Sequence, residues 1–364
     1  MKIFVASIAL VPILLLAVSC RALPNSEIFP TVGHQPTQVS SGPYPAPYTN
    51  YPAPKDGVPY FTVAPIDFSQ SIRITALGHI GGGGHVEPTA HAGIYAPTPS
   101  TVQNIYAITN GTVIGLYQDN NKWKITFRAT DNLYYYLDGV VTSNPPAPGS
   151  EVHAGDLLGT TLMGGALDVG AFDASVTLTG FVDPARYSYD EQHCVTPWEY
   201  FTEPIKSQIY AKIYRKPGAT QDARIDQDVP GTLAGTWFEE SLPDDAEIVE
   251  GPLGWPKTVS FALDEYDGVT PRFSLGGWIF TLHPPGTLQN GGVWDVPSSV
   301  VASWASITPF SGLVEMPLIN SNNIQEGWLA VNMFGSNAIE IEIWATSTET
   351  WPRSFDAGAL YYYR

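Results

Sequence analysis

Short runs of β-branched and aromatic residues recur along this chain, separated by frequent breaks that are rich in glycine, proline and asparagine. The 364 residues include 34 glycines and 32 prolines. Runs of this kind, bounded by turn-forming residues, are typical of strands. The chain is therefore predicted to be all-β, with one helix at Trp198–Tyr210 after Pro197. Strands are expected at Ser71–Leu77, Gly111–Tyr117, Lys122–Arg128, Leu133–Leu137, Thr258–Leu263, Arg272–Leu282, Trp328–Met333 and Ala338–Trp344.

The N-terminus has the layout of an export signal. Met1 and Lys2 give a short positive start, and residues 3–18 are almost entirely apolar. This run is a little short for a membrane-spanning helix, which needs roughly 20 apolar residues, although an uncleaved anchor helix is the alternative. The segment ends in Ser19-Cys20, and a small residue before a cysteine at this place resembles a bacterial lipobox. The resemblance implies that Cys20 is lipidated and anchors an exported protein to the bacterial cell envelope; an ordinary signal peptide with an incidental cysteine is the other interpretation.

Cysteine content and charge narrow the expectations further. Cys20 and Cys194 are the only two cysteines, so acylation of Cys20 leaves Cys194 without an intramolecular partner, and packed cores must supply the stability. The chain has 17 Lys and Arg against 35 Asp and Glu, which argues against nucleic acid as a partner. Residues 225–364 hold 18 acidic and 4 basic residues, and such asymmetry indicates a domain boundary.

Five segments are predicted along the chain. They are a lipoprotein signal peptide (1–20), a Pro- and Tyr-rich tether (21–60), a first β domain (61–214), a polar hinge (215–224) and a Trp-rich, acidic β domain (225–364). The tether favours extended polyproline conformation and would hold the folded part off the membrane. The last segment has the length and the many short strands of a β-barrel or a β-sandwich.

Two stretches of the first domain resemble the lysostaphin-type (LytM-like) zinc peptidases of cell-wall turnover. One is His91-Ala-Gly-Ile-Tyr-Ala-Pro97 with the residues 105–113 that follow it, and the other is Gly149-Ser-Glu-Val-His-Ala-Gly-Asp-Leu-Leu-Gly159. The resemblance covers roughly residues 70–175. It implies the hybrid-motif β-sheet that this family shares with biotinyl and lipoyl carriers, and it is more specific for the fold than for the activity.

The family's catalytic residues are carried over only in part. Its zinc ligands are the His and Asp of H-x3-D and the second His of H-x-H. Here His91 matches the first ligand, Tyr95 stands at the Asp position, and Ala166-Leu167-Asp168 stands at H-x-H. The family's additional active-site histidine falls near Gly139. Because a catalytic zinc needs three protein ligands and an open position, the standard site is absent and no catalytic residue is assigned.

A rebuilt metal site is nevertheless suggested by three histidines. His79, His85 and His91 recur at six-residue intervals, and the glycines at 81–84 allow the loop to fold back so that His79 and His85 converge. Imidazole is the commonest neutral metal ligand, and Asp168 offers an oxygen ligand. One hypothesis is a zinc site made by these four residues; the other is a set of loop histidines that bond to the backbone.

The second domain resembles a lipocalin-like barrel at its ends. Gly235-Thr236-Trp237 matches the G-x-W start, whose tryptophan closes the barrel bottom, and Arg364 resembles the basic residue that packs on it. Eight of the ten tryptophans lie in this domain. Trp faces stack on sugar rings, so either a glycan-binding surface or ordinary core packing explains them. Trp237 and Tyr95 are the candidate ligand-binding residues.

Two functions follow from these patterns. The first is a non-catalytic, peptidase-like envelope lipoprotein that binds peptidoglycan, another wall component or a glycan. The second is a zinc-dependent hydrolase with a rearranged metal site. The lost ligand positions favour the first function, and the three histidines keep the second open.

Overall fold

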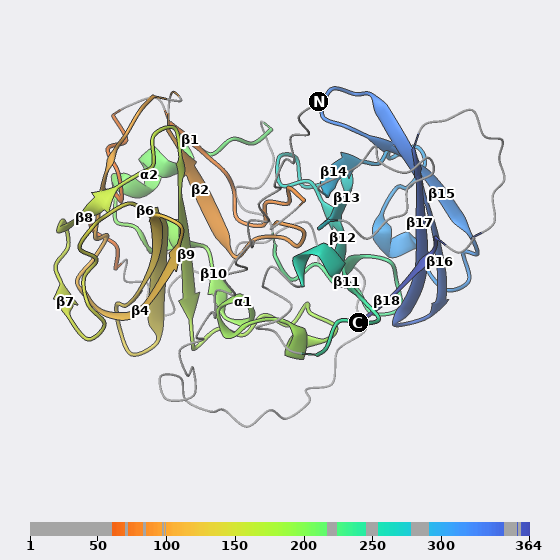
Figure 1. Cartoon of the computed structure of the whole chain (residues 1–364), viewed down its shortest axis with the longest axis horizontal. Helices are drawn as coiled ribbons and strands as arrows, with labels where there is room; N and C mark the ends of the chain where they lie inside the picture. The colour runs from red at the N-terminus through yellow and green to blue at the C-terminus, as the bar shows by residue number, and fades with distance from the viewer. Residues whose placement is uncertain are drawn as a thin grey trace, which may run out of the picture. The chain divides into compact units, whose positions relative to one another are not determined.

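A computed structural model of the chain describes residues 60–69, 72–82, 85–96, 98, 100–216, 224–244, 254–277, 291–345, 355 and 358–364. All of them lie in one compact unit, which runs from Val39 to Arg364. The predicted signal peptide with Cys20, nearly all of the tether and most of the hinge lie outside the described residues. Figure 1 shows the described elements, which are mostly strands, and the predicted all-β class is confirmed.

The first group of strands forms an eight-stranded antiparallel sheet in the order β1-β2-β9-β6-β5-β4-β7, with β10 paired to β9. A separate two-stranded sheet joins β3 and β8. The eight strands are β1 (Arg73–Ile74), β2 (His91–Tyr95), β4 (Gly111–Asp119), β5 (Lys122–Arg128), β6 (Leu133–Val140), β7 (Glu151–Val152), β9 (Ala166–Asp173) and β10 (Cys194–Val195). The two strands of the small sheet are β3 (Asn104–Tyr106) and β8 (Leu157–Thr160).

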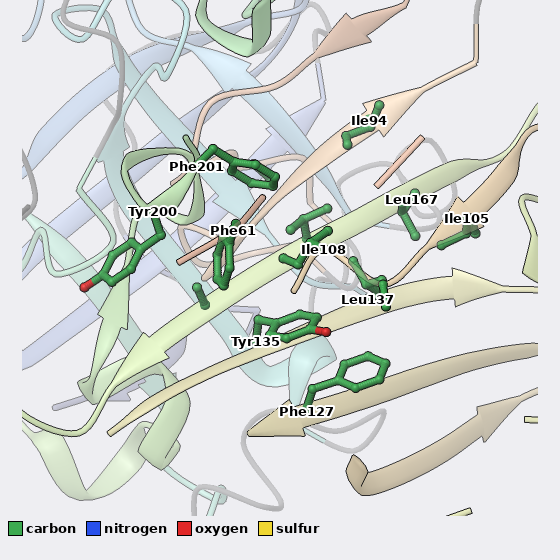
Figure 2. Packing of buried hydrophobic residues seen from close by; sticks show 14 of the residues in the cluster. Phe61, Ile94, Ile105, Ile108, Phe127, Tyr135, Leu137, Leu167, Tyr200 and Phe201 are labelled. Atoms are coloured by element: carbon green, nitrogen blue, oxygen red, sulfur yellow. The ribbon is translucent and has the colours of Figure 1, made fainter. Parts of the chain in front are cut away.

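One face of the large sheet packs on a hydrophobic core. Alternate residues of its central strands are buried there, namely Ile94, Leu137 and Leu167. Figure 2 shows them with a group of aromatic side chains, among them Phe127 and Tyr135, whose rings stack with centroids 4.6 Å apart. Because successive residues of a strand point to opposite faces, this burial leaves the intervening residues of β2, β6 and β9 on the other face.

The helices are short: η2 (Pro184–Arg186), α1 (Tyr189–Gln192), η3 (Pro197–Tyr200), α2 (Ile205–Tyr210), η4 (Trp255–Lys257) and η5 (Trp304–Ser306). The single helix predicted over Trp198–Tyr210 is wrong, because η3 ends at Tyr200 and α2 begins after Pro204. A proline lacks the N–H group that a helix interior requires and clashes with the preceding turn, so one helix cannot run through Pro204. Among the described residues, no helix has the length and apolar character needed to cross a membrane.

The second group of strands closes into an eight-stranded barrel, which decides between the two predicted architectures. The strands follow chain order, and β18 pairs with both β17 and β11. They are β11 (Gly235–Glu239), β12 (Thr258–Leu263), β13 (Pro271–Leu275), β14 (Gly292–Asp295), β15 (Val314–Ile319), β16 (Gln325–Gly335), β17 (Ala338–Ala345) and β18 (Leu360–Tyr363). On β17 the alternation seen in the sequence places Ile339, Ile341 and Ile343 in the barrel core.

The two ends of the barrel segment meet in the way that the lipocalin resemblance implies. The Cζ atom of Arg364 lies 3.9 Å from the centroid of a Trp237 ring. Its guanidinium donates to the carbonyls of Ala234, Val229 and Thr232. The Trp237 indole Nε1 donates to the Leu233 carbonyl at 2.9 Å. Trp237 is fully buried within the barrel core.

Candidate functional site

Polar side chains gather on the face of the large sheet that is opposite its core. In an antiparallel pair, directly opposed residues point to the same side. Asp168 of β9 is opposed to Gly93 of β2 and to Asp138 of β6. His91 of β2 is opposed to Gly170 of β9. His91, Asp138 and Asp168 therefore share this face.

Two glycines on this face make room for larger neighbours. A Cβ at Gly93 would lie 2.9 Å from the ring of Tyr95 and 3.2 Å from Oδ1 of Asp168. A Cβ at Gly170 would lie 2.2 Å from the ring of Tyr136. Glycine weakens a strand interior, and its presence there often marks a close approach by another group. Here the close approach is made by the side chains around His91.

The loop before β2 folds back on itself, as its glycines predict. The Gly81 and Gly82 amides both donate to the His85 carbonyl, at 2.9 and 3.2 Å, and the His85 amide donates to the Gly82 carbonyl at 3.0 Å. Gly82 has a φ of +71°, which favours glycine. Nearer the base of the loop, the Thr89 amide donates to the His79 carbonyl at 3.0 Å. The two arms of the loop are thus tied together, with His79 and His85 on opposite arms.

The structure brings the four predicted metal-site residues into one cluster. The ring centroids of His79 and His85 are 6.0 Å apart, and those of His85 and His91 are 5.3 Å apart. Nε2 of His91 lies 3.9 Å from Oδ2 of Asp168. Within the described part of the chain, however, no group of three or more His, Cys, Asp or Glu side chains has the arrangement of a metal site. The residues meet, and their binding of zinc stays a prediction.

Burial sets the protonation of this cluster. Burial, with smaller effects from His85, Lys124 and His79, lowers the pKa of His91 to about 3. Burial and the charge of His79 also lower the pKa of His85. Burial raises the pKa of Asp168 to about 7, and the nearby Asp138 carboxylate acts in the same direction. His85 and His91 are therefore neutral at pH 7, which is the form that binds a metal ion.

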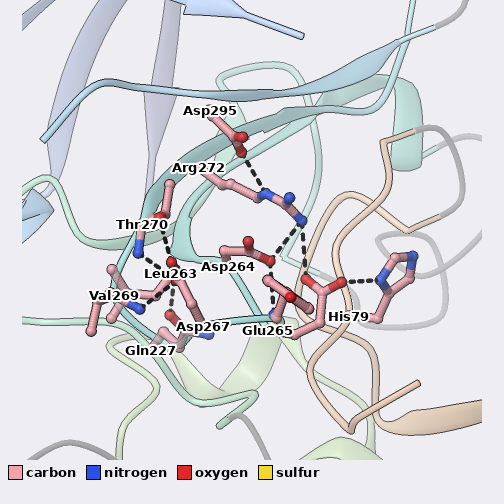
Figure 3. A network of polar contacts seen from close by, with 11 residues as sticks. His79, Gln227, Leu263, Asp264, Glu265, Asp267, Val269, Thr270, Arg272 and Asp295 are labelled. Atoms are coloured by element: carbon pink, nitrogen blue, oxygen red, sulfur yellow. Dashed lines mark hydrogen bonds and ion pairs between the residues drawn. The ribbon is translucent and has the colours of Figure 1, made fainter. Parts of the chain in front are cut away.

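A barrel residue that sequence patterns did not indicate also reaches this cluster. Nδ1 of His79 lies 2.8 Å from Oε1 of Glu265, which follows strand β12 (Figure 3). Burial alone would raise the pKa of Glu265, but the hydrogen bond and charge of His79, together with Arg272, lower it. Glu265 is therefore a carboxylate at neutral pH.

Three positions where the family has functional side chains hold tyrosine, alanine and glycine here. Tyr95 ends β2 and is opposed to Ala166 of β9. Gly139 has a φ of +100°, and a Cβ there would lie 2.7 Å from the Ala166 carbonyl oxygen. A histidine at position 139 would therefore require the backbone to move. His91 is the one family ligand that is retained, because Tyr95 stands at the Asp position and Asp168 at the second histidine of H-x-H.

No family model matches the chain, and none of the curated proteins compared with it is similar. Among solved structures, Csd3 from Helicobacter pylori in its hexagonal crystal is 15% identical, with a TM-score of 0.28 over 39% of this chain and 33% of that one. A chain of the SpoIIQ–SpoIIIAH pore-forming complex is 10% identical, with a TM-score of 0.30 over 41% of this chain and 96% of that one. The chain thus spans about a third of the length of Csd3. Neither likeness is close enough to assign a fold family or an activity.

The two candidate ligand-binding residues differ in their surroundings. Tyr95 is 36% exposed and borders the histidine cluster, whereas Trp237 is fully buried beneath Arg364. The Cζ atom of Arg73 lies 5.7 Å from the centroid of the Tyr95 ring and 4.5 Å from that of Tyr214, which is 53% exposed. A cation thus lies between two accessible aromatic rings beside the cluster.

Proposed function

We propose that this chain is an exported, lipid-anchored envelope protein that binds a cell-wall or glycan component through its peptidase-like sheet without cleaving it. The observation that carries this proposal is the pairing of Tyr95 with Ala166 on the face that holds His91. A phenol therefore stands at the position of a family metal ligand, the Asp of H-x3-D, and a methyl group stands at the first histidine of H-x-H. Export and the anchor rest on the sequence of residues 1–20.

A metal ion fits this proposal as a structural component. Tetrahedral zinc keeps its nitrogen and oxygen ligands at about 2.0–2.2 Å, which separates neighbouring ligand atoms by about 3.3 Å. Nε2 of His91 and Oδ2 of Asp168 are 3.9 Å apart, so a shift of about half an ångström brings them to that spacing. Zinc held by His79, His85, His91 and Asp168 would have all four positions filled, and closed sites of this kind are structural.

The ligand class is supported by the exposed surface beside the cluster. Tyr95 and Tyr214 present aromatic rings on either side of Arg73. Such rings offer apolar faces to sugar rings, and a guanidinium forms paired hydrogen bonds with carboxylates. Peptidoglycan contains both sugar rings and carboxylates, so this surface matches its chemistry.

Sedimentation with insoluble peptidoglycan tests the binding. We expect the full chain to sediment with it and Tyr95→Ala to bind about tenfold more weakly, which corresponds to about 1.4 kcal/mol. Tyr361→Ala is the matched control, because Tyr361 is a 43% exposed tyrosine on barrel strand β18. Failure of the parent protein to sediment, or equal losses in the two variants, contradicts the proposal.

A zinc hydrolase with a rearranged site is the second candidate, and the convergence of three histidines favours it. A catalytic zinc needs an open coordination position for water, whereas the four residues here would fill the site. We therefore expect no cleavage of glycyl peptides or wall cross-bridges, with or without zinc. Cleavage that His91→Ala abolishes would replace the binding proposal with the hydrolase.

A further inference from the structure

The loop before β2 that carries His79 and His85, called the histidine loop below, packs against the barrel as well as against the sheet. A Cβ on Gly82 would lie 2.7 Å from the backbone of Gly292 at the start of β14. A Cβ on Gly276, just after β13, would lie 2.7 Å from Cγ2 of Val86. Gly82 thus allows the loop backbone to approach that of β14, and Gly276 makes room for the Val86 side chain.

Glu265 makes a polar contact between the barrel and the histidine loop, and each of its carboxylate oxygens has a hydrogen-bond partner. Oε1 lies 2.8 Å from Nδ1 of His79, and Oε2 accepts from Nη1 of Arg272 at 3.2 Å. Arg272 is itself fixed by Asp264 at 2.9 Å and Asp295 at 2.7 Å. Figure 3 shows the chain of contacts that runs from Asp295 through Arg272 and Glu265 to His79. The carboxylate is therefore held in place before any ligand arrives.

The contact determines which nitrogen of His79 faces the cluster. A carboxylate accepts hydrogen bonds and donates none, so the proton of a neutral His79 lies on Nδ1 and Nε2 keeps its lone pair. Nε2 lies 3.2 Å from the position that a Cβ on Gly81 would take, and Cβ of His85 lies 3.8 Å from the same position. The free nitrogen of His79 is thus on the side of His85.

We propose that Glu265 is a positioning residue of the histidine site, and that the barrel thereby supplies the outer partner of a metal ligand carried by the sheet domain. The inference rests on the proposed metal site. A carboxylate that accepts from the second ring nitrogen fixes the orientation of a metal-bound histidine and raises its basicity. Three neutral imidazoles and the Asp168 carboxylate would leave a divalent ion with one uncompensated positive charge, which Glu265 offsets.

Zinc titration of the metal-free full chain tests this role. We expect Glu265→Ala to lower zinc affinity about 10–100-fold, the usual effect of losing such a partner. Glu265→Gln should lose less, because its amide oxygen can still accept from Nδ1. Glu326→Ala is the control, since Glu326 is a barrel glutamate that bonds the Trp294 indole at 2.8 Å and the Asn320 amide at 2.6 Å.

A second measurement needs no metal. For the neutral imidazole of His79 in the metal-free protein, nitrogen NMR should show the proton on Nδ1 in the parent chain and a mixture of tautomers in Glu265→Ala. Absence of zinc binding by the parent protein overturns the metal site, and the inference with it. Zinc binding that Glu265→Ala and Glu326→Ala leave equally intact overturns the inference alone, as does an unchanged His79 tautomer, while the proposed wall binding stands.

Discussion

At the scale of single residues, contacts between residues close in the sequence could be predicted better than contacts between distant ones. The convergence of His79 with His85 could be inferred because a glycine-rich loop joins them. Asp168 could be predicted as a member of the same site from its position in a family motif. Glu265 had no comparable signal, because 186 residues separate it from His79 and only the tertiary fold brings the two together. The contact of Arg364 with Trp237 also joins residues that are distant in the sequence, but the G-x-W resemblance indicated it.

Replacing Arg364 with Ala should destabilise the barrel. The side chain of Arg364 is fully buried, stacks on Trp237 and lies 3.9 Å from the buried Asp228 carboxylate. Its loss removes the hydrogen bonds to three carbonyls and the ion pair with Asp228. Breaking a buried ion pair costs about 3–5 kcal/mol, and we expect a loss in that range from urea denaturation. Arg364→Lys should lose less, since it keeps the charge but not the planar stack; equal stability of Arg364→Ala and the parent chain contradicts the prediction.

At the scale of elements, the strands were the most predictable part of the fold. The strands Lys122–Arg128 and Thr258–Leu263 have the bounds that their residue patterns predict. The helix prediction failed at Pro204, where a local signal for a break was present but outweighed by the helical pattern around it. Closure of the barrel depends on the pairing of Phe238 with Tyr363, which belong to its first and last strands. A pairing between such distant strands leaves no periodic pattern in the sequence.

The close approach of the histidine loop to the barrel can be tested at Gly82. Gly82 and Gly231 have φ angles of +71° and +72°, so alanine meets the same backbone strain at both positions, about 1–2 kcal/mol. At Gly231 nothing lies within 4 Å of the new Cβ, whereas at Gly82 it meets the Gly292 backbone at 2.7 Å. Gly82→Ala should therefore cost about 1–3 kcal/mol more than Gly231→Ala in denaturation. It should also weaken zinc binding, which Gly231→Ala should leave intact; equal losses in the two variants argue against the close approach.

At the scale of the whole molecule, the described residues pack into hydrophobic cores. The sheet and the barrel each have a hydrophobic core. A third buried cluster contains Leu77 and Cys194 from the first segment and Phe238 and Leu242 from the barrel segment. The composition predicted that cores must carry the stability, but it could not predict a shared one. Apolar contacts between distant segments are set by the tertiary fold rather than by any local pattern.

The lipid anchor is the prediction that concerns the whole molecule, because it determines where the protein acts. Cys20 follows an apolar run and a small residue, and it is expected to become the lipidated first residue of the mature chain. Cells grown with a fatty-acid analogue should therefore label the parent protein, and Cys20→Ala should abolish the label. A single acyl chain gives only marginal membrane binding, so stable fractionation with membranes would indicate more than one chain on the anchor.

Cys194→Ser provides the matched control for this experiment. Cys194 is fully buried, with its sulfur 3.7 Å from the Ala90 carbonyl oxygen, so an acyl-transfer enzyme cannot reach its thiol in the folded protein. The serine variant should keep the label of the parent chain. Label that persists in Cys20→Ala, or a parent protein without label, is incompatible with the lipobox interpretation. Loss of label in Cys194→Ser alone would place the modification on the folded domain, and the tether would then have no anchored end from which to hold the histidine site off the membrane.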